Sequence, residues 1–300
     1  MKTILEAVPP ESHRGEAGIE AVLEKVAAVH ALSPLDGVNI PEIHEEPARS
    51  KKGERRRPFA PRVPPRELAG LIQQRLGIDC MINHVVVHHH SNQALLDWAE
   101  KTFEVYGVSD FVLVGGGRHA FAYPGPSVAQ ANTLLREQAA IPNLRIGNIC
   151  IPSRQNEAER MQAKAQAGAH FFTTQILYEP TDFTKLLDAI NTNNAAIEEV
   201  LLAFCPVRSQ QNIRFLLWLG VEISDALEQW LTAAEGNVET RSLEQIKSTW
   251  QTIAEHQQIA GVRQPQLGIN LAPIGPIPPA TSADLAHSLA AVHARGNDTV

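Results

Sequence analysis

TILEAVPPESHRGEAGIEAVLEKVAAVHAL, residues 3–32, joins a short apolar run to a longer segment with helical periodicity. The run TILEAV has the length and composition of a buried strand, and Pro9 and Pro10 end it because proline cannot donate a ladder hydrogen bond. From Gly15 onward, apolar residues recur every three or four positions. The residues of this stripe are Ile19, Val22, Leu23, Val26 and Val29. The stretch therefore predicts a strand followed by a helix that packs through one face.

The same alternation of strand and helix continues along the chain. Seven further strand-like runs are GVNIPEI (37–43), DCMINHVVV (79–87), FVLVGGG (111–117), NLRIGNICI (143–151), HFFTTQILY (170–178), EEVLLAFCPV (198–207) and PQLGINL (265–271). Helix-like segments lie at 65–77, 91–107, 156–168, 212–220, 223–236, 242–258 and 282–294, and others start near Ser127 and Asp182. Parallel strands buried on both faces read as continuous apolar runs of this kind. We therefore expect residues 1–300 to form one (β/α)8 TIM barrel, with extra helices after the seventh strand and at the C-terminus.

Composition narrows the classes of function. The hydrophobic content of 44 % is sufficient for a packed core, and the net charge of -7 argues against a nucleic-acid partner because it repels phosphates. Cys80, Cys150 and Cys205 all lie in apolar runs, which favours buried thiols in a reducing compartment. The start of the chain has no secretory signal pattern, and no apolar run reaches the ~20 residues of a membrane helix. We expect a cytoplasmic protein with no membrane partner.

Residues 46–64, after the second strand-like run, are basic and rich in proline and have no periodicity. A mobile loop between a strand and a helix is the simplest interpretation. Its lysines and arginines could bind an anionic tail or a cofactor phosphate, although charge runs are more often simply solvated.

In a barrel of this class the active site lies at the carboxyl ends of the strands. Glu6 falls at such an end, where a partly dry environment would raise its pKa and let it serve as a general acid. The other polar candidates at strand ends are Glu42, His84, His88, Gly115–Gly117, Asn148, Gln175, Arg208 and Asn270.

Three segments, in order along the chain, resemble methylenetetrahydrofolate reductases. They are ILEAVPPES (4–12), QAGAHFFTTQILYEP (166–180) and LWLGVEISDALEQW (217–230). The resemblance implies a barrel enzyme of one-carbon metabolism and methionine biosynthesis. Such an enzyme reduces 5,10-methylenetetrahydrofolate to 5-methyltetrahydrofolate with NADH or NADPH, usually through bound FAD.

The resemblance also implies roles for individual residues. Glu6 falls on the family's general acid and Gln175 on a glutamine that contacts folate, and Asn39 and Gly117 are further substrate-binding candidates. The implied cofactor-binding residues are His84, Tyr123, Asn148 and Lys164.

Two departures from the family pattern concern the cofactor and the substrate. Gly117, in VGGGRH, replaces the aspartate that tunes the flavin in the family, and CPVRSQQ (205–211) lacks the aromatic residue that stacks on folate. The segment IPSRQNEAERMQAK (151–164) resembles a divergent group in which hydride passes directly from the nicotinamide. FAD is therefore left open, and so is a barrel that binds folate without reducing it.

HVVVHHHSN, residues 84–92, raises a third alternative, a metal-dependent hydrolase. On a strand, His84, His88 and His90 would share one face, and imidazoles bind zinc well. The later strand-like runs lack the further ligands that such hydrolases need, because His170 starts its run and Asn270 stands where an aspartate is required. We expect no metal site.

Overall fold

A computed structural model describes residues 1–45, 50, 53, 58–116, 122–193, 195–233, 236–259 and 265–297. In this part of the chain, eight parallel strands pair in sequence order and close between β8 and β1. The strands are β1 (Thr3–Glu6), β2 (Gly37–Pro41), β3 (Cys80–Val85), β4 (Asp110–Val114), β5 (Arg145–Cys150), β6 (Phe171–Thr174), β7 (Glu199–Phe204) and β8 (Gln266–Leu271). The predicted TIM barrel is confirmed.

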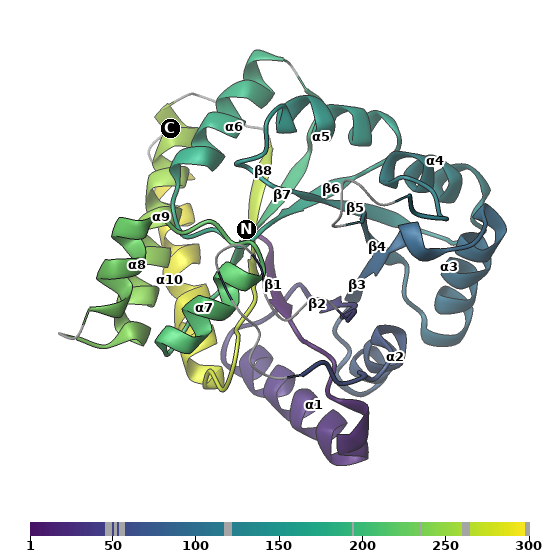
Figure 1. The fold of residues 1–300 in the computed structure, drawn as a ribbon, viewed down its shortest axis with the longest axis horizontal. Helices are drawn as coiled ribbons and strands as arrows, with labels where there is room; N and C mark the ends of the chain where they lie inside the picture. Colours follow the sequence, from purple (N-terminus) through teal and green to yellow (C-terminus); the bar gives the residue numbers. More distant parts are fainter. Residues whose placement is uncertain are drawn as a thin grey trace.

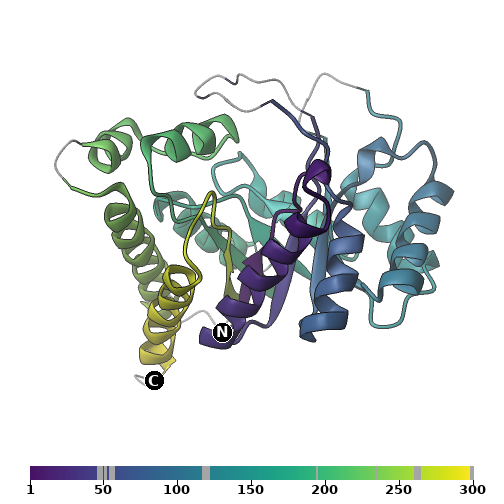
Figure 2. The same cartoon turned by 90° about the horizontal axis from the view of Figure 1, so that it is seen from below.

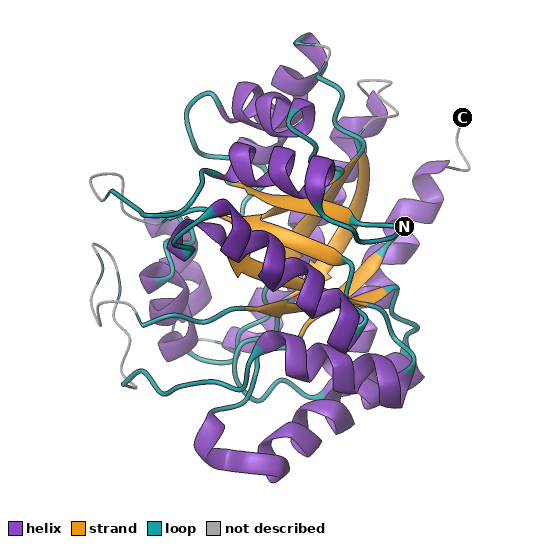
Figure 3. Cartoon of the chain, turned by 90° about the vertical axis from the view of Figure 1, so that its right-hand side faces the viewer, coloured by secondary structure: helices purple, strands orange, loops and turns teal. Residues whose placement is uncertain are grey.

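Helices surround the barrel (Figures 1 and 3). They are α1 (Gly15–Leu32), α2 (Pro65–Leu76), α3 (Asn92–Tyr106), α4 (Val128–Gln138), α5 (Glu157–Gln166), α6 (Thr181–Thr192), α7 (Gln210–Trp218), α8 (Asp225–Thr232), α9 (Val238–Ile259) and α10 (Pro279–Asn297), with short 3-10 turns η1 (Ser12–Arg14) and η2 (Val86–His88). The extra helices predicted after the seventh strand are α7, α8 and α9. Within the described ranges, no helix is long and apolar enough to cross a bilayer.

Local sequence signals fix the ends of several helices. Ser91 accepts a hydrogen bond from the amide of Ala94 at the start of α3, and Gly107 ends that helix at a φ of +71°. Ser127 forms a reciprocal capping box with Gln130 at the start of α4. These are the residue types that satisfy unpaired backbone groups at helix ends, which explains why the boundaries could be predicted.

The barrel interior is built in layers, because alternate residues of each strand point inward. A dry middle layer consists of Ile4, Met81, Val112, Phe171 and Leu201, with Ile149 packed against it. This cluster is separate from the large core that the strands form with the helices. It therefore closes the barrel as a packed floor rather than leaving a pore.

An ion-pair network lies at the amino ends of the strands, below the apolar layer. The guanidinium of Arg145 contacts Asp110 at 3.2 Å and Glu199 at 2.8 Å, and Lys2 contacts Glu199 at 3.2 Å. The same guanidinium lies 5.0 Å from the ring centre of Phe171. The helices α7 and α8 lie toward the opposite end of the barrel, on the side away from both termini (Figure 2). Ion pairs thus fill the barrel at the amino ends of the strands, and the carboxyl ends are available to form a site.

The three cysteines are confirmed as buried free thiols. Burial raises the pKa of each of them above its ordinary value, so they are protonated at neutral pH.

Gly147 should be required by the middle layer of the barrel. A Cβ at this position would clash with the ring of Phe171, which fills the centre. We expect Gly147→Ala to lower the free energy of unfolding by about 1–3 kcal/mol through overpacking, as measured by urea denaturation. In a Phe171→Leu background the same substitution should cost clearly less, and an equal cost in both backgrounds would contradict this explanation.

Candidate active site

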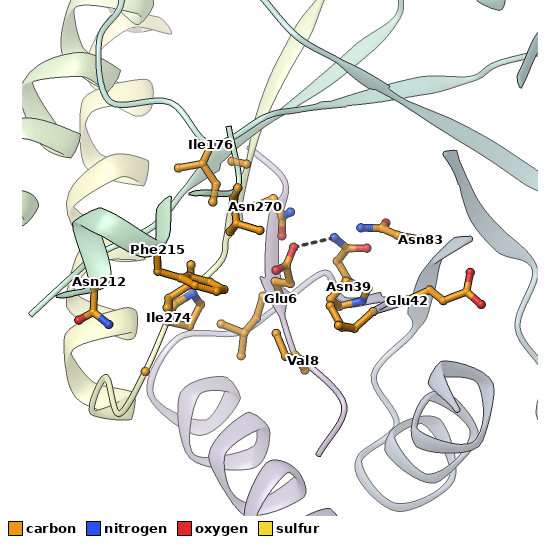
Figure 4. A pocket seen from close by; sticks show the side chains of 18 of the residues that line it. Glu6, Val8, Asn39, Glu42, Asn83, Ile176, Asn212, Phe215, Asn270 and Ile274 are labelled. Atoms are coloured by element: carbon orange, nitrogen blue, oxygen red, sulfur yellow. Dashed lines mark hydrogen bonds between the residues drawn. The ribbon is translucent and has the colours of Figure 1, made fainter. Parts of the chain in front are cut away.

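A cavity of about 1120 Å³ opens at the carboxyl ends of the strands, directly above the dry layer. Its wall comes from strand ends, from α1 and α7, and from the turn after β8. Ligand pockets typically measure roughly 300–1,000 Å³, so this cavity can hold a large ligand. In the close-up, the side chains of Glu6, Asn39, Asn83 and Asn270 gather at one side, facing Phe215 and Ile274 (Figure 4).

Glu6 is the carboxyl group at the base of the cavity. It is the last residue of β1 and pairs in register with Asn39, whose Nδ2 donates a hydrogen bond to Glu6 Oε2 at 3.3 Å. Burial raises the pKa of Glu6 to about 7, against the opposing effect of hydrogen bonds from Asn270 and Asn39. Glu6 can therefore hold a proton near neutral pH and release it to a ligand, which is the property of a general acid.

Several polar atoms around Glu6 have no hydrogen-bond partner among the described residues. They are Asn39 Oδ1, Asn83 Oδ1, Asn270 Oδ1 and Thr173 Oγ1. The three asparagines line the cavity from β2, β3 and β8, and Thr173 lines it from β6. A buried acceptor without a partner is costly, so a bound molecule with N–H or O–H donors would satisfy these oxygens. The base of the cavity thus suits a polar heterocycle.

A second carboxylate, Glu42, has the opposite character. Its Oε2 lies 2.9 Å from His84 Nδ1 and 3.3 Å from His44 Nε2, and it accepts the amide hydrogen of Val85 at 2.9 Å. Burial disfavours the charge of Glu42, but these hydrogen bonds outweigh burial and hold its pKa well below the ordinary range. Glu42 also lines the cavity, so one pocket contains one carboxyl that retains its proton and one that stays ionised.

The predicted substrate residues differ in where they lie. Asn39 and Gln175 line the cavity with Glu6. The side chain of Gln175 is engaged by backbone groups, since its Oε1 accepts the amide hydrogen of Ile176 at 2.9 Å and its Nε2 donates to the Leu219 carbonyl at 3.4 Å. Gly117 lies outside the described residues. The roles of these residues stay predictions.

The predicted cofactor residues do not line this cavity, and protein groups already engage them. The His84 ring stacks on Trp98 at 3.5 Å. Asn148 exchanges hydrogen bonds with Asn132, and Lys164 Nζ donates to the Ile149 carbonyl at 2.8 Å.

Tyr123 is engaged in the same way, since its ring occupies the space that a Cβ at Gly116 would need. As arranged in the described part of the chain, the four predicted cofactor residues do not fit a flavin.

The histidine run is arranged differently from an extended strand. The 3-10 turn at Val86–His88 changes the phase of the chain, so His84 Nε2 faces His89 Nε2 at 2.7 Å instead of sharing a face with His88 and His90. Over the described residues, no group of three or more His, Cys, Asp or Glu side chains is arranged to hold a metal ion.

The loop after β2 contributes to the mouth of the cavity through its described residues. Pro58 and Arg62 line it, and Arg62 Nη1 donates to the Pro9 carbonyl at 3.1 Å. The basic residues Lys51, Lys52 and Arg55 to Arg57 lie outside the described residues.

Sequence reasoning missed three residues of the cavity wall. Asn83 is one position before His84 and points inward where His84 points outward, a distinction that the phase of the inner apolar positions of β3 could have revealed. Phe215 and Trp218 of α7, whose rings stack at 5.3 Å, provide the aromatic surface that CPVRSQQ itself lacks. They stand one or two helical turns beyond that segment, where no short motif could identify them.

Comparison with known proteins found a similarity to one family model and to solved structures. The family model described as methylenetetrahydrofolate reductase matches residues 138–264. A comparison with curated proteins gave no match.

Two solved structures share the fold. A Clostridium thermocellum protein, described as uncharacterized and as binding two copies of 5-methyl-5,6,7,8-tetrahydrofolic acid, is 18 % identical with a TM-score of 0.73, over 95 % of this chain and 93 % of that one. The C-terminal domain of a "putative chitinase" from Desulfitobacterium hafniense DCB-2 is 10 % identical with a TM-score of 0.55, over 97 % and 99 %. At these identities the likeness is one of fold.

The family match extends from the end of α4 to the segment before β8, and thus includes Gln175 and the aromatic helix α7. The resemblance to the methylenetetrahydrofolate reductase family that the sequence predicts is thereby confirmed, over residues 138–264 of the chain.

Proposed function

We propose that this barrel binds a reduced folate with its pterin ring at Glu6, and that it reduces 5,10-methylenetetrahydrofolate to 5-methyltetrahydrofolate with NADH or NADPH. The observation on which the proposal rests is a carboxyl group with a pKa of about 7, surrounded by unpartnered amide oxygens at the base of a large cavity. The family match and the folate named for the Clostridium thermocellum protein add support.

The proposed reaction balances with groups in this cavity. The bond between the methylene carbon and one of its two nitrogens breaks, and that nitrogen takes the proton of Glu6. The resulting iminium carbon takes a hydride from the nicotinamide, which leaves oxidised nicotinamide and the methyl product, and solvent returns a proton to Glu6. General acid catalysis of this kind typically contributes roughly 10²–10⁴-fold to the rate.

The amides and the aromatic helix would supply binding and orientation. Asn39, Asn83 and Asn270 have side-chain oxygens that no described residue engages, and these could accept from the N–H donors of a reduced pterin. Phe215 and Trp218 offer flat apolar surface on the facing wall. Holding the reactants in a productive geometry can supply roughly 7 kcal/mol or more of the barrier.

The direct assay adds NADH or NADPH and methylenetetrahydrofolate to the purified protein and follows nicotinamide absorbance, with the product identified by mass. The visible spectrum of the same sample reports whether a flavin is present. Oxidation that requires both reactants supports the proposal, whether the protein is yellow or colourless.

A specific observation favours one other function, binding of a folate without reduction. The residues predicted to hold a cofactor are engaged elsewhere, and the Clostridium thermocellum protein is described only as binding methyltetrahydrofolate. Tight binding of methyltetrahydrofolate by a protein that oxidises neither nicotinamide would identify this alternative.

We expect Glu6→Gln to retain the fold and to bind folate within a few-fold of the wild type, while its turnover falls roughly 10²–10⁴-fold because the proton donor is lost. Steady-state rates and binding titrations measure the two effects separately. Glu137→Gln, a change at an exposed position on α4, is the matched control and should leave both unchanged. Normal turnover of the Glu6 variant would remove this residue from the mechanism.

The raised pKa of Glu6 also predicts a pH-dependent stability. Between about pH 4.5 and pH 7 the native state holds a proton that the unfolded chain has released, so this group makes the protein less stable as the pH rises. Glu6→Gln should therefore gain up to about 3 kcal/mol in unfolding free energy, relative to the wild type, between pH 4.5 and pH 8. Urea denaturation at the two pH values measures it, and a pH-independent difference would contradict the raised pKa.

A further inference from the structure

Lys25 is a charged group in the cavity wall for which the described residues provide no partner. It lies on the face of α1 that borders the cavity, between Val22 and Val26. Its ammonium group makes no hydrogen bond or ion pair with any residue in the described part of the chain. Burial lowers its pKa below the ordinary value for lysine. A partly desolvated ammonium without a partner is unfavourable in the empty protein.

Two other cations that line the cavity, Arg208 and Arg62, are paired with carboxylates. Arg208 Nε lies 2.9 Å from Glu239 Oε2, and Arg62 Nη2 lies 3.7 Å from Glu11 Oε1. Arg214 also lines the cavity without a carboxylate partner in the described structure, but it is exposed, whereas Lys25 is half-buried. Lys25 thus offers a positive charge that no carboxylate in the described structure neutralises, in a chain whose net charge is -7.

The cavity is lined by polar groups around Glu6 and by apolar side chains elsewhere. Its base is polar and holds the unpartnered amide oxygens. Apolar side chains also line the cavity, among them Val8, Phe215 and Ile274. Figure 4 shows Phe215 and Ile274 on the far side of Glu6 from Asn83. Lys25 borders the same cavity from α1. A ligand with a polar ring, an apolar part and an anionic group matches this lining.

We propose that Lys25 binds an anionic group, a carboxylate or a phosphate, of the ligand whose ring lies at Glu6. This inference rests on the proposed function, which places a pterin ring at Glu6. In a reduced folate the anionic group is a glutamate carboxylate of the tail. In a nicotinamide dinucleotide it is a phosphate, and the two sources can be separated by experiment.

The test compares the wild type with Lys25→Met, which keeps the aliphatic stem and removes the charge. Binding is titrated with 5-methyltetrahydrofolate, with a tetrahydropterin that lacks the tail, and with NADPH. We expect affinity for the folate to fall about 10-fold or more, as for the loss of a charge-assisted hydrogen bond, while tetrahydropterin binding is unchanged. A selective loss of NADPH affinity would instead identify the phosphate source. Unchanged affinity for all three, or an equal loss for all three, would overturn the proposal.

Stability without ligand provides a second readout that a structural lysine would not give. Removing an unpaired, partly buried charge should raise the thermal midpoint of Lys25→Met, so the variant should be more stable and yet bind the anionic ligand less tightly. A lower midpoint would show that Lys25 supports the fold and would count against the proposal. Lys101→Met, at an exposed position on α3, is the matched control and should change neither quantity.

The two proposals fail in different ways. Wild-type protein that binds neither folate nor tetrahydropterin would contradict the proposed function, and the role of Lys25 with it. Wild-type protein that binds folate, together with an equally tight Lys25→Met, would contradict only the role of Lys25.

Discussion

The packing of five apolar side chains inside the barrel is the constraint on which the rest of the structure depends. Ile4, Met81, Val112, Phe171 and Leu201 close the centre, and Gly147 leaves room for the ring of Phe171. Because side chains alternate along a strand, the inward positions two residues further on form the next layer. That layer contains Glu6, Asn83 and Thr173, so a dry layer of side chains lies directly beneath the polar base of the cavity.

This arrangement explains why two glutamates in one cavity differ in charge. Glu6 stands on the apolar layer with neutral amides as neighbours, and burial dominates its pKa. Glu42 stands at the rim, where two imidazoles and a backbone amide donate to it and keep it ionised. Environments that push the pKa values of two carboxyls apart are a common basis of acid–base catalysis, and here they favour Glu6 as the proton donor.

Polar groups that have no partner in the described part of the chain indicate the chemistry of the ligand better than any single motif does. The unpartnered amide oxygens around Glu6 call for hydrogen-bond donors, and the unpaired ammonium of Lys25 calls for an anion. The stacked rings of Phe215 and Trp218 line the same cavity. Side chains that the sequence suggested for a cofactor, such as Asn148 and Lys164, are by contrast already satisfied. We therefore expect the contacts that bind the ligand to be made in the cavity above Glu6.

The sequence by itself determined the barrel, most helix ends and the position of Glu6. These follow from local physics: apolar runs and stripes at fixed periods, caps such as Ser91 and Gly107, and a carboxylate at the end of a strand. Only the tertiary structure decided which polar side chains share the cavity. Asn83 and His84 are adjacent in sequence, but the phase of β3 sends one into the barrel and the other against Trp98. Lys25 and Phe215 reach the cavity from helices far apart in the chain, because closing the barrel brings α1 and α7 to the same opening, and no local pattern records that closure.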